Sequence, residues 1–515
     1  MRITRQTITR YAEVMISSVR QSKEQLTLTS LLVAAILVRF RNLETPISGS
    51  YTFRNTQTAW GIRSVANGAL SPFSIETPVL GPPWKIPFEF PLYQMIAGLL
   101  SRVTGYSTEL SGRLTSLTFF IMAGLIFYCI CRCFFSQFLS TLVLALFLFN
   151  SHNLEYGSSV LIEYCAVFFA LASFLFAIKY FDTCKEKFLI LYFVFGSISA
   201  LVKITTSFVW VILGVLAINF IRGTNRWILI RCLVVGAIGH IPSFAWTRWT
   251  DLQKSKSKMT DWLTSANLQE WNFGSLRQRL FYFDWERSIG QIFLPSLVGV
   301  TAVAVGLIVL ALSFSANLKT PLAFLLLFLS GPIIFTNLYF VHDYYWTAVL
   351  PAFLILIGFG LQTFSIINSN SKKFIENRIH IFQVLIVISL VSASWFSAYG
   401  KRHFDVFIKP GSLSWNDERV EIAVRAINNF TKPEEKIIIV GSDWNPQILY
   451  FADRKGLMIP TGWSLAEVIS DQKLKSNFEY IYWYSDTLVD LADAKTESGA
   501  DTLSSVAPNL YKLGD

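Results

Sequence analysis

Charged residues are scarce in this chain of 515 residues: Asp, Glu, Lys and Arg together make up 15% of it. A soluble domain usually carries about 25% of these residues. Hydrophobic residues make up 53% instead, and the mean hydropathy is +0.46. This composition excludes an ordinary soluble enzyme and indicates that most of the chain lies in lipid.

Histidines and nucleotide-binding motifs are also lacking. The five histidines form no ligand cluster, and no HExxH, P-loop or GxGxxG pattern occurs, so zinc hydrolysis and ATP-driven transport have no support. The net charge of +10 does not indicate nucleic acid, because membrane proteins gather Lys and Arg in cytoplasmic loops and near anionic headgroups. We therefore expect membrane lipids, and no nucleic acid, as partners.

Cysteines are few and lie away from the segments that we predict to be outside the membrane. Cys129, Cys131 and Cys133 follow i, i+2, i+4 spacing, which lets only the first and third share a helix face. Packed or lipid-facing thiols are therefore favoured over a metal site. The outer segments depend on no disulfide.

Apolar runs of spanning length are abundant. The first, Leu26 to Val38, ends at Arg39 without a small-residue cleavage site and indicates a retained span. Ten more follow at about 113–134, 138–151, 159–180, 187–203, 206–221, 227–247, 288–314, 320–338, 346–367 and 380–398. The sequence thus predicts an α-helical integral membrane protein with about eleven transmembrane helices in residues 27–398, after a cytoplasmic N-terminus of residues 1–26.

Basic residues in the short loops set the orientation. With the N-terminus inside, the loops that carry Arg132, Lys185, Arg226, Lys319 and Lys373 all face the cytoplasm, and the opposite short loops, 152–157 and 339–345, contain no Lys or Arg. This distribution follows the positive-inside rule. It places three larger segments outside: 42–112, 248–287 and 399–515.

The last of these segments has a different composition, because spanning runs stop near Lys401 and charged residues return. Helical periodicity over 420–430 and 444–452, and β-branched or aromatic runs over 436–441 and 480–484, predict a small extracytoplasmic α/β domain. We find no catalytic constellation in it.

The first outer segment holds the richest polar chemistry. Phe53 to Gln94 places basic groups, amides and one carboxylate beside aromatic and proline-rich stretches that cannot form one long helix. We interpret it as an active-site loop. A reaction on the outer side can use a sugar carried on a polyprenyl phosphate. Such an enzyme needs cations for the phosphate, a carboxylate as general base, and aromatic walls.

Several motifs in chain order carry a family resemblance over about residues 30 to 400. They are Arg54-Asn55-Thr56-Gln57-Thr58-Ala59, Glu89-Phe90-Pro91-Leu92-Tyr93-Gln94, Ser111-Gly112-Arg113, Tyr156-Gly157 with Glu163, Ala200-Leu201-Val202-Lys203, and His342-Asp343-Tyr344-Tyr345 with Pro351. Together they resemble the glycosyltransferase-C (GT-C) superfamily, in particular relatives of protein O-mannosyltransferases and the lipid A aminoarabinose transferase. The resemblance implies the GT-C fold and a polyprenyl-phosphate-linked sugar as donor, with no required cofactor and the need for a divalent metal left open.

One departure from the family concerns the general base. The family commonly has an acidic residue early in the first loop, where this chain has Gln57 or Asn55, and an amide accepts no proton at neutral pH. We expect Glu89 to serve as catalytic base, with Glu163 in reserve. The alternatives are structural pairs, of Glu89 with Lys85 or a nearby Arg and of Glu163 with Lys203 or Arg113.

The remaining predicted site residues fall into two groups. The resemblance and their predicted place near the outer interface assign the donor phosphate to Arg54, Arg63, Lys85, Arg113 and Lys203, each of which has a headgroup-snorkelling alternative. Substrate contacts are assigned to Gln57, Tyr93, His342, Asp343 and Tyr345. The segment 248–287 is either a lid over the cavity or an interfacial amphipathic stretch.

The resemblance implies a transferase of the bacterial inner membrane that moves a monosaccharide, a hexose or a pentose, to a hydroxyl of a glycan, lipid or protein, with inversion. A flippase or transporter for a lipid-linked glycan, or an inactive scaffold of an envelope assembly complex, is the alternative. Transporters commonly carry internal repeats, which the sequence lacks. The sugar, the acceptor and the oligomeric state stay open.

Overall fold

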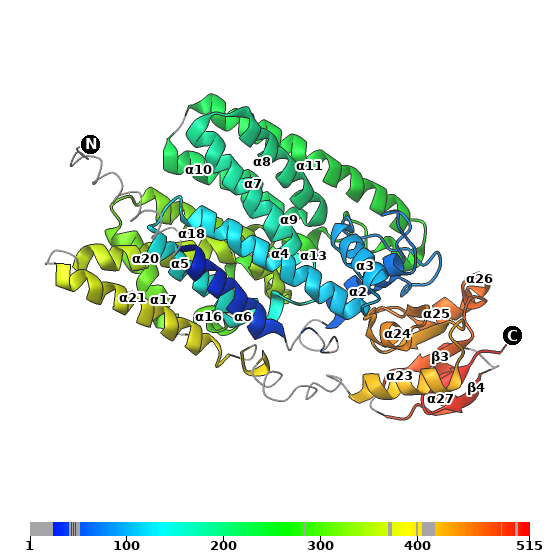
Figure 1. Cartoon of the computed structure of the whole chain (residues 1–515). Helices are drawn as coiled ribbons and strands as arrows, with labels where there is room; N and C mark the ends of the chain where they lie inside the picture. The colour runs from blue at the N-terminus through cyan, green and yellow to red at the C-terminus, as the bar shows by residue number, and fades with distance from the viewer. Residues whose placement is uncertain are drawn as a thin grey trace, which may run out of the picture.

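The structure is a computed structural model that describes residues 24–40, 52–223, 225–281, 285–299, 301–368, 373–397, 400–403, 418–485, 487–499 and 503–514, with residues 43, 45 and 47. Most of the N-terminal segment predicted to be cytoplasmic therefore lies outside the described residues. Helices make up the part before residue 404, and an α/β unit follows from residue 418 (Figure 1).

After a helix over 24–40, the helical part contains the following labelled elements. They are α2 (Thr52–Ala66), α3 (Leu92–Thr104), α4 (Thr108–Cys131), α5 (Gln137–Phe149), α6 (Ser151–Tyr156), α7 (Glu163–Thr183), α8 (Glu186–Val202), α9 (Ile204–Ser207), η1 (Phe208–Leu213), α10 (Gly214–Arg222), α11 (Arg226–Lys254), α12 (Lys258–Asp261), α13 (Gln269–Phe273), α14 (Leu276–Leu280), η2 (Glu286–Phe293), α16 (Leu294–Val298), α17 (Thr301–Phe314), α18 (Lys319–Ile334), α19 (Thr336–Val341), η3 (Asp343–Ala348), α20 (Leu350–Asn368) and α21 (Lys373–Ser394).

Five helices of the described residues are long and apolar enough to cross a membrane, and a sixth is counted if a pair bent by 97° forms one span. The five are Thr108–Cys131, Glu163–Thr183, Ile204–Arg222, Arg226–Lys254 and Leu350–Ile367. Other predicted spans coincide with apolar helices of only 10–17 residues, Gln137–Phe149, Lys319–Ile334 and Arg378–Ser394. Eleven spans thus remain a prediction, because apolar composition does not fix where a helix breaks.

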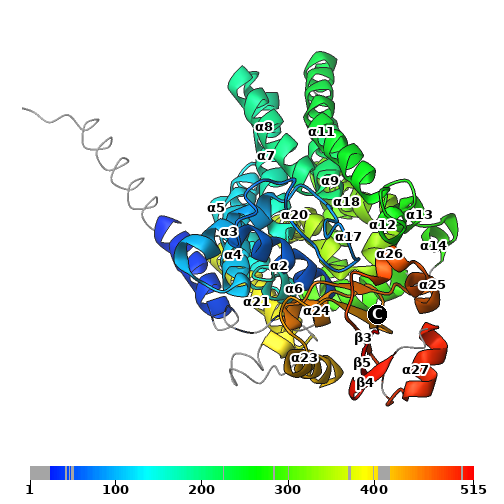
Figure 2. The same cartoon turned by 90° about the vertical axis from the view of Figure 1, so that its right-hand side faces the viewer.

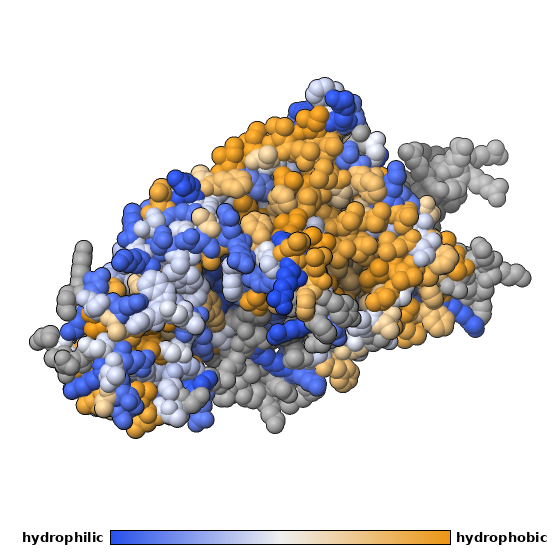
Figure 3. Space-filling model, turned by 180° about the vertical axis from the view of Figure 1, so that it is seen from behind, coloured by the Kyte–Doolittle hydropathy of each residue, from blue (hydrophilic) through white to orange (hydrophobic). Residues whose placement is uncertain are grey.

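The long helices differ in how much of their surface the protein itself covers. In α7, 83% of the most apolar window is buried inside the protein, against 28% in α11. Exposed side chains on α11 include Val234, Ile238, Ile241 and Phe244. Apolar surface extends over the helical part, while polar surface gathers at the end that carries the α/β unit (Figure 3). This separation is what a membrane-embedded bundle with one large polar end requires.

The α/β unit is built on a five-stranded sheet of order β2-β1-β3-β5-β4. β1 pairs in parallel with β2 and β3, and the two remaining strands are antiparallel. The strands predicted near 436–441 and 480–484 are β1 and β3. The elements are α23 (Glu418–Phe430), β1 (Ile437–Val440), α24 (Gln447–Ala452), β2 (Gly456–Met458), α25 (Leu465–Ser470), α26 (Gln472–Lys475), β3 (Tyr480–Trp483), α27 (Leu491–Ser498), β4 (Ser504–Ala507) and β5 (Leu510–Lys512).

The first outer segment extends this sheet at the β2 edge. Leu80 forms a bridge with Leu457, the N–H groups of Gly456 and Met458 donate to the carbonyls of Pro78 and Val79 at 3.0 and 2.8 Å, and Lys455 pairs with Glu76 at 2.6 Å. The unit therefore lies beside α2 at one end of the helices (Figure 2). Residues 52–91, 254–263 and 444–478, from all three predicted outer segments, meet at this end.

The crossing of α2 and α3 gives a prediction about stability. A Cβ added at Gly98 would lie 2.7 Å from the Ile62 carbonyl oxygen and 2.5 Å from the Val65 Cβ, so Gly98→Ala should lower the unfolding free energy by about 1–3 kcal/mol. The control is Gly306→Ala, where nothing lies within 4 Å. Thermal unfolding of the purified chain measures both, and equal melting temperatures would contradict the close crossing.

Candidate active site

Residues 88–90 are held between two helices by their backbone. The Phe88 carbonyl accepts a hydrogen bond from the Trp246 indole of α11 at 2.9 Å. The Phe90 N–H donates to the Leu201 carbonyl near the end of α8 at 3.1 Å. Glu89 lies between these two anchors. Its position is therefore set by helices about 110 to 160 residues further along the chain.

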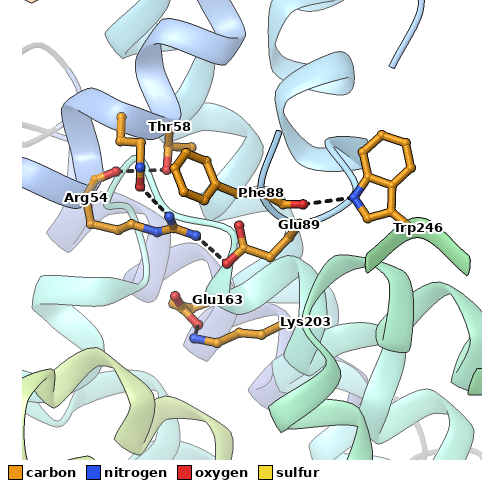
Figure 4. A network of polar contacts seen from close by, with 8 residues as sticks. Arg54, Thr58, Phe88, Glu89, Glu163, Lys203 and Trp246 are labelled. Atoms are coloured by element: carbon orange, nitrogen blue, oxygen red, sulfur yellow. Dashed lines mark hydrogen bonds and ion pairs between the residues drawn. The ribbon is translucent and has the colours of Figure 1, made fainter. Parts of the chain in front are cut away.

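The Glu89 side chain pairs with Arg54 of α2. The Arg54 Nη2 lies 2.5 Å from the Glu89 Oε1, and Arg54 Nη1 donates to the Gln57 Oε1 one turn later (Figure 4). Burial alone would raise the pKa of the Glu89 carboxyl, but the Arg54 charge and hydrogen bond outweigh it and the net pKa is below the ordinary 4.5. Glu89 is therefore ionised at neutral pH.

Lys203 reaches the same region because a helix breaks there. Lys203 has extended backbone angles between α8 and α9, φ −159° and ψ 98°, and its ammonium donates to the Glu163 carboxylate at the start of α7. Lys203 and Glu163 are both buried, with side chains 5% and 2% exposed. Figure 4 places this pair beneath Arg54 and Glu89. The second Glu163 oxygen, Oε1, has no hydrogen-bond partner.

Aromatic rings form a wall beside Lys203. Its ammonium lies 3.6 Å from the Tyr345 ring centroid and 5.1 Å from that of Tyr344, distances at which the ring face attracts a cation. His342 stacks on Tyr344 at 5.1 Å. Burial, and then the charges of Arg54 and Lys203, lower the pKa of His342 to about 4, so this imidazole is neutral at pH 7. Asp343 accepts a hydrogen bond from the Tyr156 hydroxyl at 2.5 Å.

A third cation, Lys254, lies at the end of α11. It is 7% exposed, and its ammonium is 5.1 Å from the Phe88 ring centroid. Its charge interacts most with that of Asp251, one turn earlier, and then with those of Glu89 and Arg54. No carboxylate of the described residues lies within 4 Å of it, whereas Arg54 and Lys203 each have one. Three cations thus share this region with two carboxylates. Burying an ammonium that has no carboxylate in direct contact costs free energy, and a bound anion would offset that cost.

Other predicted phosphate ligands lie elsewhere. Arg63 binds the Tyr450 carbonyl and Asp453 of the α/β unit at 2.9 and 2.7 Å, and Lys85 lines a cavity beside Arg63. Arg113 donates to the Thr45 carbonyl at 3.1 Å. The structure brings together only Arg54 and Lys203 of the five, and a phosphate-binding role for the other three stays a prediction without support from this geometry.

Some of the predicted substrate residues lie in this cluster, and Tyr93 does not. Gln57 contacts Arg54, and Tyr345 contacts Lys203, so both lie in the cluster. Tyr93 is fully buried and binds the Gly112 carbonyl and the Ser116 hydroxyl at 2.7 and 2.8 Å, which joins α3 to α4. Its position indicates a role in helix packing.

The segment 248–287 covers the same region. Trp262 packs edge-on against Trp444 of the α/β unit with ring centroids 5.3 Å apart, and Trp444 also contacts Phe53 and Phe88 at 4.7 and 6.1 Å. Trp271 lies 6.0 Å from the ring of His342. This position suits the predicted lid, which stays a prediction because one arrangement does not reveal motion.

Sequence reasoning missed Lys254 as a site residue. It ended the preceding span at about residue 247, while the helix continues to residue 254. A signal was present, because Gly239, Ser243, Trp246, Thr250 and Lys254 recur at intervals of three or four and are all buried on one helix face. Trp444 had no such signal, since its contacts join segments nearly 400 residues apart.

Metal-binding potential is low in the part of the chain that the structure describes. Within the described ranges, no group of three or more His, Cys, Asp or Glu side chains is arranged to hold a metal ion. The described side chains of the site are two carboxylates, three cations and an aromatic wall, and the need for a divalent metal stays open.

The buried pair Lys203–Glu163 gives a second prediction about stability. Lys203→Met leaves the Glu163 carboxylate buried without its cation, which should cost about 3–5 kcal/mol of unfolding free energy. The double variant with Glu163→Gln should recover a large part of that loss, because no buried charge remains. Chemical unfolding of both variants tests this expectation, and an equal loss in both would contradict the pair.

Comparisons by sequence and by structure give different results. Searches against family models and against curated proteins found no match. By structure, the chain is similar to ArnT from Cupriavidus metallidurans bound to undecaprenyl phosphate. The TM-score is 0.61 at 11% identity, over 94% of this chain and 97% of that chain.

Two further solved structures have the same architecture. The archaeal oligosaccharyltransferase AglB from Archaeoglobus fulgidus, in complex with an inhibitory peptide and a dolichol-phosphate, has a TM-score of 0.56 at 10% identity, over 93% of this chain and 71% of that chain. The arabinofuranosyltransferase AftD from Mycobacteria has a TM-score of 0.57 at 13% identity, over 95% and 40%. At such low identity the likeness is one of fold. The chain has the fold of the GT-C glycosyltransferases.

Proposed function

We propose that this chain is a membrane glycosyltransferase that moves a monosaccharide from a polyprenyl-phosphate donor to an acceptor hydroxyl on the outer face of a bacterial inner membrane. The observation that carries this proposal is Lys254, a buried lysine beside the Arg54–Glu89 pair that forms no ion pair within 4 Å with a carboxylate of the described residues. An anionic headgroup delivered from the membrane is a suitable occupant. The GT-C fold supports the proposal, since one neighbour is bound to undecaprenyl phosphate and another to a dolichol-phosphate.

Lys254 and Lys203 would bind the donor phosphate together with Arg54. Each cation is fixed by a different element: α11, the break after α8, and α2. The phosphate gains negative charge as its bond to the sugar breaks, so fixed cations stabilise the transition state more than the bound donor. Tyr344 and Tyr345 would give this anion site an aromatic wall.

Glu89 would act as the general base. Its Oε1 is engaged by Arg54, and Oε2 accepts the proton of the acceptor hydroxyl. The acceptor oxygen attacks the anomeric carbon, the bond from that carbon to the phosphate oxygen breaks, and its electron pair leaves with the phosphate. Attack opposite the leaving group inverts the anomeric configuration. Glu163 is less suited, because its carboxylate is 2% exposed and paired with Lys203.

The α/β unit and the polar end of the helices would lie outside the membrane. Described residues of the three segments that the positive-inside rule predicts to be outside meet there, and the short loop that contains His342 joins them through Trp271. This placement gives the Arg54–Glu89 pair access to a lipid-linked donor from the outer leaflet and to acceptors outside the cell membrane.

Lipid retention tests the donor site. Mass spectrometry of the gently purified chain should detect a polyprenyl phosphate or its glycoside. Lys254→Met should lower the retained amount about tenfold or more, because a charge-assisted contact contributes about 1.5–3 kcal/mol. Lys256→Met is the matched control, since this exposed lysine binds only Gln253. Equal retention of bulk phospholipid alone by all three proteins would contradict the phosphate site.

Transfer activity tests the base. Glu89→Gln should lower the transfer rate about 10²–10⁴-fold while the bound lipid is retained. Glu186→Gln, at an exposed pair with Arg231, should leave the rate unchanged. Because the pKa of Glu89 is lowered, the wild-type rate should fall only as the pH drops below 4.5. An unchanged rate in Glu89→Gln would exclude this base and favour the transporter or the scaffold.

A further inference from the structure

A small cavity lies against the Arg54–Glu89 pair, and none of its lining residues is one of the lysines. Its polar lining consists of Arg54, Gln57, Thr58, Glu89 and Gln94, with Thr77 further out, and its apolar lining includes Ile75, Pro87 and Trp246. Lys203, Lys254 and Glu163 do not line it. The pair thus has the lysine cluster on one side and this cavity on another. In an inverting transfer the attacking hydroxyl and the leaving phosphate lie on opposite sides of the donor's anomeric carbon. The cavity and the lysine cluster could therefore hold these two groups.

Two amide side chains of the cavity each have one atom without a hydrogen-bond partner. The Gln57 Oε1 accepts from Arg54, which turns the Gln57 Nε2 away from the guanidinium, and this donor has no acceptor. The Gln94 Oε1 is a buried acceptor without a donor. Buried polar groups are rarely left unpaired. A ligand that both donates and accepts hydrogen bonds would satisfy the two amides together.

The charge and size of the cavity limit that ligand. No lysine lines the cavity and the Glu89 carboxylate repels anions, so a neutral hydroxyl is favoured in it over a phosphate or carboxylate. The cavity volume is about 40 Å³, whereas one water needs about 10–15 Å³ by the same measure. The space therefore admits a group of the size of a hydroxymethyl, and a whole sugar ring would remain outside.

An aromatic surface lies beside the cavity. Phe73 is 55% exposed and contacts Trp246 and Trp249 with ring centroids 5.6 and 4.9 Å apart, and the two tryptophans are 4.8 Å apart. Trp246 also lines the cavity. Of these rings Phe73 is exposed, Trp249 is half-buried and Trp246 is buried. An exposed aromatic face next to hydroxyl-binding groups suits the apolar C–H face of a sugar ring.

We propose that the acceptor is a sugar with a free hydroxymethyl group, which enters the amide-lined cavity while the ring lies on the exposed face of Phe73 beside Trp249. This inference rests on the proposed transferase function and names the class of its acceptor. As bound, the hydroxymethyl oxygen would accept from Gln57 and donate its one proton to Gln94, and rotation of the hydroxyl would then turn that proton to Glu89 for the reaction. It is the atom that attacks the anomeric carbon of the donor, and its proton passes to Glu89 as described above.

Two monosaccharide probes test the proposal without a transfer reaction. Methyl β-D-glucopyranoside carries the hydroxymethyl group, and methyl β-D-xylopyranoside has the same ring without it. The full chain in lipid nanodiscs should bind the glucoside about tenfold more tightly, and saturation-transfer NMR should show the strongest contact at the glucoside C6 protons. Equal affinity for the two probes, or no binding of either, would overturn the proposal.

Variants locate the probe. A Cβ on Gly61 would lie 2.9 Å from the Gln94 Cγ, so Gly61→Ala displaces a flexible side chain into the cavity and should abolish the preference for the glucoside. Gln94→Met removes the hydrogen-bond acceptor Oε1 and should also reduce the preference for the glucoside. Phe73→Ala should lower the affinity for both glycosides by the same factor. Gly306→Ala, in open space, is the control, and an unchanged preference in both cavity variants would place the hydroxymethyl group elsewhere.

The outcome separates this inference from the proposed function. Hydroxymethyl-selective binding without any retained polyprenyl phosphate would support the sugar site and overturn the transferase. Retained polyprenyl phosphate with no selectivity between the probes would overturn the acceptor proposal and leave the transferase standing.

Discussion

The position of one carboxylate depends on backbone hydrogen bonds between distant segments. Glu89 is fixed because Phe88 binds Trp246 of α11 and Phe90 binds the carbonyl of Leu201 where α8 ends. A helix end leaves carbonyl groups without hydrogen-bond donors. Here the Phe90 N–H is the donor for the Leu201 carbonyl. The break that exposes this carbonyl also turns Lys203 inward. One structural irregularity thus positions both the carboxylate and a cation.

Charge balance gives the site its character. Two ion pairs, Arg54–Glu89 and Lys203–Glu163, are internally neutral, and Lys254 adds one positive charge that has no carboxylate of the described residues within 4 Å. A site of this kind is stable enough to fold, because four of its five charges are paired, yet it still attracts one anion. Buried cations whose cost is met by a ligand are a common feature of binding sites. This balance is why we place the donor phosphate at Lys254 rather than at the more exposed basic residues.

The α/β unit is part of the structure around the site. Its β2 edge is extended by residues 78–81, and Trp444 inserts between Phe53 and Phe88, the neighbours of Arg54 and Glu89. An open sheet edge is a site for strand addition, and the outer segment occupies it. The predicted outer domain therefore contributes directly to holding the loop that carries the catalytic candidates.

The sequence by itself indicated the membrane class and the positions of β1 and β3, because hydropathy and periodicity can be read along the chain. It also selected Arg54, Glu89, Glu163 and Lys203, which the structure brings close together and whose roles stay predictions. It did not determine the number of full-length helices, since apolar composition is blind to breaks such as the one at Lys203. It also did not reveal that Arg63 and Arg113 lie away from Arg54 and Lys203, with which it had grouped them as phosphate ligands. Their partners, Asp453 and the Thr45 carbonyl, are distant in the chain, and only tertiary packing decides which cations remain unpaired.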